Sequence, residues 1–376
     1  MSVPFIDLRR FEDGFLSRWN ERCREISENT RFVGGPDVAR FEERLAEACG
    51  TSHAVGCANG TDAIQLALRA AGIGRGDRVL LPDATFWATF EAVVNVGATP
   101  ITVDIDPADQ QMSFELFSRA VDETAPAAAI LVHLYGWGSA RLNDFRSLCR
   151  ERDIVLVEDG AQAFGASYEG QSIYADCQMA TISFYPAKVL GSCGDAGAVV
   201  TNDADLAERI RRLGNHGRFT HYEHDLVGWN SRMAGFDGAY LDLCLDFMDE
   251  RLATRRRAAA LYRDRLKAMG FQTSGPPEGY VENGYVNVTL IEPEARPAVH
   301  ETLREQGIGF GTIYPTAVSK QPGVEGILEK AYGGENSDHL ARSVLNLPLF
   351  AYITDDEIDE VLSAMSALKG PSDGSP

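Results

Sequence analysis

The sequence predicts an α/β protein with a mainly parallel sheet, helices on both of its faces, and a smaller α+β unit after it. Between residues 53 and 213, short apolar runs alternate with helical patterns, which is typical of βαβ units. From about residue 237 this alternation stops and a long stretch rich in Leu, Arg and Ala begins. The chain has 376 residues, of which 44% are hydrophobic, enough for a sizeable core and two or three domains.

Seven runs have the length and composition of strands, and together they predict a seven-stranded sheet. In chain order they are His53–Ala58, Arg78–Leu81, Thr99–Val103, Ala127–Val132, Ile154–Val157, Ala180–Phe184 and Ala196–Thr201.

Segments with helical spacing lie before and between these runs. Pro36–Cys49, for example, places Val38, Phe41 and Leu45 on one side of a helix. The other predicted helices of this part are Thr61–Ala71, Thr85–Val96, Phe114–Val121, Ala140–Arg150 and Ala204–Leu213.

The second part is predicted to contain fewer and more varied elements. They are a long helix over Asp237–Ala268, strands at Tyr285–Leu290 and Gly309–Ile313, and helices at Arg296–Glu305 and Asp355–Leu368. We therefore predict a large domain with an N-terminal arm over residues 1–236, and a linking helix with a small domain over 237–369. Residues 370–376 cannot bury apolar surface and are expected to be disordered.

Charge and targeting features narrow the function. Thirty-five Lys and Arg against 55 Asp and Glu give a net charge of −20, opposite to that of a nonspecific nucleic-acid or anionic-membrane binder. No apolar run approaches the roughly 20 residues needed to cross a bilayer, and the N-terminus lacks a signal-peptide pattern. Seven scattered cysteines without a C-x-x-C pair indicate core thiols in a cytoplasmic protein, with no disulfide or metal site expected.

Lysine usage singles out one residue. The chain has 30 arginines but only five lysines, and Lys188 is the only lysine in the first 266 residues. An amine can lose its proton and act as a nucleophile or base, whereas guanidinium cannot. Lys188 follows a strand and precedes the glycine-rich segment Gly191–Gly197, which indicates an accessible amine in closely packed backbone. The alternative is an ordinary surface lysine.

Three further features are placed where a ligand could bind. Asn59-Gly60-Thr61 joins a strand to a helix, where free N–H groups suit a phosphate, although an ordinary helix cap is the alternative. Asp159 closes an apolar strand, either as a ligand-facing carboxylate or as a cap. Phe86 and Trp87 could supply an aromatic ring face. Pyridoxal phosphate needs an anion site, a carboxylate for its ring nitrogen and a lysine for its Schiff base, and these features together provide them.

At these segments the chain resembles fold-type I aminotransferases of the DegT/DnrJ/StrS sugar-aminotransferase family. The resemblance covers nearly the whole chain in family order. The matching segments are Ala58–Ala63, Thr85–Thr89, Val132–Gly136, Glu158–Ala163, Ser183–Lys188, Gly194–Gly197, Gly228–Met233 and Leu345–Phe350.

The resemblance implies roles for residues around the cofactor ring. Lys188 would form the Schiff base and move the catalytic proton, and Asp159 would pair with the ring nitrogen. Gln162 would meet the ring hydroxyl. Phe86 would stack on the ring, although Trp87 is one position away.

The resemblance also implies a phosphate site shared between subunits. Gly60, Thr61 and Ser183 would hold the phosphate, and Asn230 would reach it from the neighbouring subunit of a homodimer. Asn230 follows a loop whose polar and aromatic composition is itself typical of an interface.

The implied activity is transfer of an amino group from an amino acid such as L-glutamate to a nucleotide-linked keto-sugar, with pyridoxamine phosphate as the intermediate cofactor form. One alternative is an aminotransferase for a keto-cyclitol, and another is a non-catalytic sensor with the same fold. Ser319 lies near a position where the family usually carries histidine, and residues 234–239 depart from the family pattern, so the sugar itself is not predicted.

Overall fold

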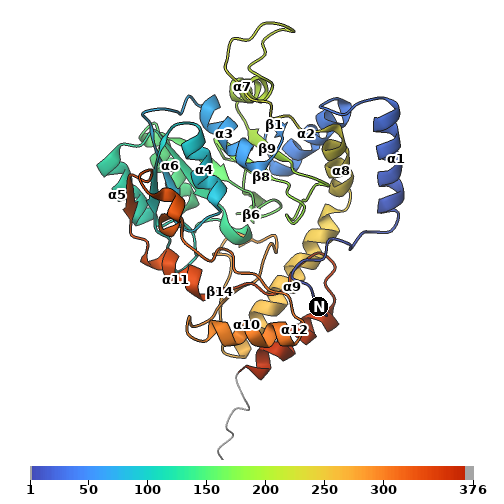
Figure 1. Ribbon diagram of the computed structural model, residues 1–376, viewed down its shortest axis with the longest axis vertical. Coiled ribbons are helices and arrows are strands. Elements are labelled where there is room, and N and C mark those ends of the chain that lie inside the picture. Colours follow the sequence, from blue (N-terminus) through green and yellow to red (C-terminus); the bar gives the residue numbers. More distant parts are fainter. Residues whose placement is uncertain (1, 369–376) are drawn as a thin grey trace, which may run out of the picture.

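The computed structural model describes residues 2–368, and its centre is a mixed, mostly parallel sheet of eight strands. Helices pack around this sheet, and the C-terminal elements gather at one end of the molecule (Figure 1). Within the described sheet, β9 pairs antiparallel with both neighbours and the other pairings are parallel. The strands, in order across the sheet, are β1 (His53–Cys57), β9 (Gly197–Thr201), β8 (Met179–Ser183), β5 (Val155–Asp159), β4 (Ala128–Val132), β2 (Arg78–Pro82), β3 (Thr99–Val103) and β13 (Lys330–Tyr332).

The predicted fold class is confirmed, with one strand more than expected. All seven predicted strands are present, and β13 adds an eighth from the second half of the chain. Lys330-Ala-Tyr332 is too short to show a strand pattern in the sequence. It becomes a strand because Lys330 pairs with Ile101 and Tyr332 with Val103 of β3.

The six helices predicted in the first part are present, with ends shifted by a few residues. Helix α3 packs against β8 and β9, α6 against β5, and α7 against β1. A helix that we did not predict, α1 (Phe15–Glu28), lies in the N-terminal arm, where Phe15 and Ile26 are buried. The predicted helices are α2 (Pro36–Cys49), α3 (Gly60–Ala70), α4 (Trp87–Asn95), α5 (Phe114–Thr124), α6 (Leu142–Glu151) and α7 (Ala204–Gly214).

Two predictions for the second part are wrong. The predicted single helix from Asp237 is two helices, α8 (Gly235–Leu245) and α9 (Met248–Ala268), separated at Phe247, whose ψ of 5° leaves the helical range. Helix α8 packs on α2, whereas α9 packs on the C-terminal helix α12 (Asp355–Ala367), so the two helices contact different parts of the molecule. The predicted strand Gly309–Ile313 makes only an isolated pairing of Gly311 with Asn346.

The remaining elements are short strands and three helices. They are β6 (Ser167–Tyr168), β7 (Gln171–Ser172), β10 (Gln272–Ser274), β11 (Tyr280–Val281), β12 (Val288–Leu290), β14 (Val344–Leu345), α10 (Arg296–Glu305), α11 (Glu335–Ser343) and α12 (Asp355–Ala367). Strands β10, β12 and β14 form one small sheet, and β11, β6 and β7 form another.

The buried apolar residues form two clusters. The smaller contains Val3 and residues between 258 and 365, which fits a second, C-terminal unit. The larger belongs to the main sheet but also includes Leu241 and Tyr332, and β11 and β13 pair with strands from before residue 236. The division at residue 236 therefore stays a prediction, and residues 370–376 lie outside the described chain. Among the described helices, none is long and apolar enough to cross a membrane.

Candidate active site

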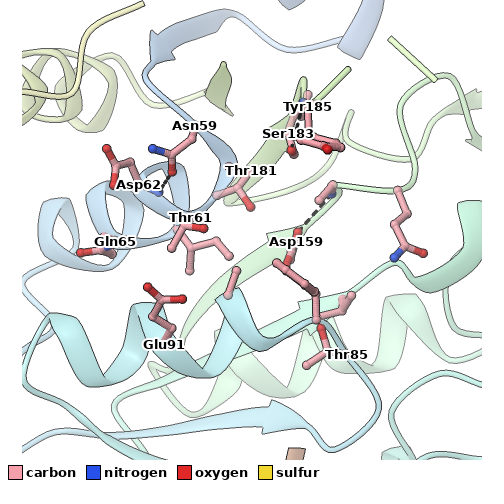
Figure 2. A pocket seen from close by; sticks show the side chains of 18 of the residues that line it. Asn59, Thr61, Asp62, Gln65, Thr85, Glu91, Asp159, Thr181, Ser183 and Tyr185 are labelled. Carbon is pink, nitrogen blue, oxygen red and sulfur yellow. Dashed lines mark hydrogen bonds between the residues drawn. The ribbon is translucent and has the colours of Figure 1, made fainter. Parts of the chain in front are cut away.

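A cavity of about 850 Å³ opens at the carboxyl ends of the central strands. Val132, Asp159 and Ser183, the last residues of β4, β5 and β8, line it, together with Gly60 at the start of α3. Figure 2 shows Asp159 and Ser183 at the strand ends and Thr61 at the start of α3, all three around the cavity. This edge of a parallel sheet is where α/β proteins bind ligands.

The first turn of α3 has the geometry of an anion-binding site. Asn59 caps the helix, with its side-chain oxygen accepting a hydrogen bond from the Asp62 N–H at 2.8 Å (Figure 2). A Cβ added to Gly60 would lie 2.7 Å from the Ser183 Cβ, so only glycine lets the helix start this close to the end of β8. The N–H groups of a first turn have no partner within the helix, and the partial positive charge there favours a phosphate. The predicted residues Gly60, Thr61 and Ser183 all line this part of the cavity.

Asp159 is a buried carboxylate at the cavity wall. One of its oxygens accepts from the Ala161 N–H at 3.0 Å, and the other accepts from the Thr89 hydroxyl at 3.1 Å. Burial raises the pKa of Asp159, because desolvation outweighs these hydrogen bonds and the nearby charge of Lys188. The ionised carboxylate would therefore be stabilised by a cation bound in the cavity.

Lys188 is the one basic residue among the described residues that line this cavity. Its Nζ donates to the Tyr285 hydroxyl at 3.3 Å and lies 5.0 Å from the centre of the Tyr285 ring. A Cβ at Gly191 would lie 2.3 Å from the Pro186 carbonyl oxygen, so the turn after Lys188 requires glycine. The turn therefore explains the glycine three residues after the lysine, and the Lys188 amine lines the same cavity as Asp159.

Gln162 and Phe86 complete the predicted ring environment. Gln162 accepts from the Tyr135 N–H at 2.7 Å and donates to the Tyr314 hydroxyl at 2.9 Å, which fixes its orientation. The Phe86 side chain lines the cavity, with its ring 5.5 Å from that of Tyr314. Trp87 instead begins α4 and packs on Phe90, so of the two neighbouring aromatics Phe86 is the one that lines the cavity.

Asn230 is the predicted residue that the fold does not bring into this cavity. It is exposed, and its side-chain oxygen accepts from Arg232 at 2.6 Å. Its neighbour Trp229 does line the cavity, beneath the Arg69 guanidinium at 4.0 Å from the ring centre. The other predicted site residues lie together in the cavity: Gly60, Thr61, Phe86, Asp159, Gln162, Ser183 and Lys188.

The structure adds residues that the sequence did not indicate. Tyr314 and Tyr285 come from the second half of the chain, and no motif marks them. Thr89 follows Phe86 on α4 and could have been noticed as a hydroxyl one turn from the aromatic pair. The Thr181 hydroxyl lines the cavity and is buried without a hydrogen-bond partner in the described chain, so it is available to a bound group.

The residues present fit pyridoxal phosphate. The cavity combines an anion site at Gly60, which an added Cβ would fill, with the buried Asp159 carboxylate, which has no ion-pair partner in the described chain. It also contains the Lys188 amine and the aromatic ring of Phe86. These are the groups that the phosphate, ring nitrogen, aldehyde and ring of this cofactor require.

The fold and this site define a fold-type I aminotransferase, and comparison with known proteins supports this. Residues 17–366 match the model of the DegT/DnrJ/EryC1/StrS aminotransferase family. The chain belongs to this family, whose members depend on pyridoxal phosphate, and it is an aminotransferase.

Individual relatives are similar over nearly their full length. The chain is 33% identical to UDP-2-acetamido-2-deoxy-3-oxo-D-glucuronate aminotransferase of Pseudomonas aeruginosa over 97% of this chain and 99% of that protein. It is 35% identical to dTDP-3-amino-3,4,6-trideoxy-alpha-D-glucose transaminase of Streptomyces venezuelae, over 96% and 95%. The crystal structure of S. venezuelae DesV in complex with a ketimine intermediate superposes with a TM-score of 0.93, at 33% identity and 99% coverage of both chains.

Proposed function

We propose that this protein uses pyridoxal phosphate to transfer the amino group of an amino acid, such as L-glutamate, to a nucleotide-linked keto-sugar. The observation that carries the proposal is the placement of the Lys188 amine and the buried Asp159 carboxylate in one cavity beside the start of α3. The names of relatives at 33% and 35% identity, which are aminotransferases of UDP- and dTDP-linked sugars, support the substrate class.

Each residue has a role that follows from its chemistry. When bound, the cofactor supplies an electron sink that stabilises negative charge at the reacting carbon. Asp159 would hold a proton on the ring nitrogen, and that ion pair would offset the cost of burying its charge. Lys188 would carry the proton between donor and acceptor positions. Gln162 would hydrogen-bond the ring hydroxyl from an orientation already fixed by Tyr135 and Tyr314.

The decisive experiment maps the cofactor attachment and tests the substrate together. Borohydride reduction of the holoenzyme should fix the cofactor on Lys188, as read by peptide mass spectrometry. The same preparation, given L-glutamate and a panel of UDP- and dTDP-linked keto-sugars, should aminate at least one of them. A reduced adduct on another lysine would contradict the assignment of Lys188, and failure with every keto-sugar would contradict the substrate class.

We further propose a homodimer with shared sites, in which Asn230 serves the phosphate of the partner subunit. Support comes from its exposed position outside the cavity of its own chain and from the exposed Phe219 and Tyr222 in the preceding loop. Mixing inactive Lys188→Ala with inactive Asn230→Asp should restore part of the activity, because one site of a mixed dimer then carries neither change. No recovery after demonstrated subunit exchange would place Asn230 in its own chain's site.

One observation favours the second candidate, an aminotransferase for a keto-cyclitol. Four carboxylates line the cavity, whereas Lys188 is the one basic side chain that the described lining residues offer. A nucleoside diphosphate would then need cations from the partner subunit. Titration with UDP and dTDP separates the two candidates, because the keto-sugar enzyme should bind one of them and the cyclitol enzyme neither. The four carboxylates are Asp62, Glu91, Asp159 and Asp195.

A further inference from the structure

A second, smaller cavity of about 100 Å³ lies against Lys188. The N-terminal arm, the turn at Gly191 and helix α9 enclose it. Of the residues that the structure describes, Lys188 alone lines both this cavity and the larger one. A group bound in the small cavity would therefore lie next to the amine that we propose carries the proton during amino transfer.

Two of the three arginines that line the small cavity are already paired. Arg10 donates to Asp7 at 2.9 Å and also bonds Glu357. Arg251 donates to both oxygens of Glu12, at 2.6 and 2.8 Å. Each of these charges therefore has a counter-charge within the chain.

Arg255, the third arginine, has no such partner. The residue is only 6% exposed, and no carboxylate of the described chain forms an ion pair with its guanidinium. Its Nη1 donates to the carbonyl oxygens of Gly284 at 3.2 Å and Leu349 at 3.5 Å, while Nε is buried without an acceptor. Desolvation lowers the pKa of Arg255 to about 10. A buried guanidinium with unused donors is costly unless an anion binds to it.

We propose that the small cavity is the subsite for a carboxylate of the amino donor, held by Arg255; this rests on the proposed function. An amino acid that presents its amine at Lys188 carries a carboxylate a few bonds away. The cavity has the volume of about three waters, which suits a carboxylate and an adjoining methylene. Asp7 is the acidic residue in its lining, and it is held by Arg9 and Arg10, so it does not compensate Arg255.

The test separates the two half-reactions. Donor saturation is measured with L-glutamate by the loss of the visible absorbance of bound pyridoxal phosphate, and acceptor saturation with the keto-sugar found active in the panel. Arg255→Gln should raise the KM for L-glutamate about 10- to 100-fold, as expected for loss of a charge-assisted hydrogen bond, with the KM for the keto-sugar within about twofold. Arg255→Lys should give a smaller rise, because it keeps the charge but loses the planar fork.

The matched control is Arg257→Gln, a surface arginine on the same helix that pairs with Asp355. It should leave both half-reactions unchanged. An increase in the KM for the keto-sugar alone would assign the subsite to the sugar and overturn the proposal, as would an unchanged KM for L-glutamate.

A binding measurement keeps the proposal testable if Arg255→Gln does not fold. Calorimetric titration of the wild-type holoenzyme should show binding of glutarate and none of the neutral glutaramide, with glutarate binding weakened in Arg255→Lys. Equal binding of both compounds, or unchanged glutarate binding in the lysine variant, would overturn the subsite. If no donor converts the bound cofactor at all, the proposed function fails instead, and the glutarate result still reports on Arg255.

Discussion

Glu158 and Asp159 are consecutive residues of β5, both are buried, and they have opposite electrostatic surroundings. Arg146 donates to both oxygens of Glu158, at 2.8 and 2.9 Å, and His133 Nε2 lies 2.8 Å from it. Asp159 has only the Ala161 N–H and the Thr89 hydroxyl as hydrogen-bond partners within the described chain. Because successive side chains of a strand point to opposite faces, one carboxylate is directed into the protein and the other into the cavity.

The pKa directions of the two residues express this difference. Burial raises the pKa of Glu158, but the His133 hydrogen bond and the Arg146 charge outweigh it, so its pKa is lowered. The pKa of Asp159 is raised, because its partners do not offset desolvation. A buried carboxylate that the fold pairs with a cation has a structural role, whereas one left without an ion-pair partner at a cavity points to a ligand.

The largest effect on turnover is expected from removing the Lys188 amine, which lines the same cavity as Asp159. Lys188→Ala should lower turnover by about a thousandfold or more, because the proposed proton carrier is lost. Steady-state amination of the keto-sugar measures this. Lys267→Ala, at an exposed lysine, is the control and should be indistinguishable from wild type. A comparable loss of turnover in both variants would contradict the catalytic role proposed for Lys188.

On the opposite face, Glu158→Gln should lower the free energy of unfolding by about 3–5 kcal/mol, because it leaves the buried Arg146 charge unpaired. Thermal or urea unfolding of the cofactor-free protein measures this change. Activity per folded molecule should stay near that of wild type. A Glu158→Gln protein that is stable but inactive would show that Glu158 takes part in catalysis, and it would contradict the structural role assigned to this residue.

Asp159→Asn should act in the opposite direction on stability. Removing a buried charge that has no ion-pair partner among the described residues should raise the melting temperature of the cofactor-free protein. Turnover should fall about a hundredfold or more, because the proposed partner of the ring proton is lost. Melting curves and steady-state rates on one preparation test both parts. Destabilisation of the cofactor-free protein together with near wild-type turnover would contradict the proposed cofactor role of Asp159 and leave it only a structural role as a capping residue.

The smallest effects are expected in the pH dependence of these two stability changes. Glu158, with its pKa below its ordinary 4.5, contributes stability that is fully present above pH 4.5 and is lost as pH falls through the folded-state pKa. Ionised Asp159 costs stability increasingly as pH rises from 3.8 through its raised pKa. Melting temperatures of both variants should therefore converge on wild type in acid, from below for Glu158→Gln and from above for Asp159→Asn. A difference that widens in acid for either variant would contradict the assigned pKa direction.

The sequence by itself determined most of the first part of the fold and indicated which residues we propose hold the cofactor. Alternating apolar runs and helical spacing are local signals, and among the described residues up to 214 they located seven of the nine strands and six of the seven α-helices. Gly60, Asp159 and Lys188 lie at or just after strand ends, and the carboxyl ends of parallel strands necessarily share one edge of the sheet. Their chemistry could therefore be predicted from local pattern and from the family resemblance.

Only the tertiary structure decided which distant residues meet there. Lys330–Tyr332 is a strand because β3 offers a free edge, and α8 and α9 are separate helices because they pack on different partners. Tyr314 and the unpaired Arg255 reach the neighbourhood of Lys188 through the packing of the second half of the chain. Nothing in the run Arg255-Arg256-Arg257 distinguishes its first member from the other two. Its burial, and the lack of a carboxylate partner, depend on contacts with Gly284 and Leu349 that no local pattern contains.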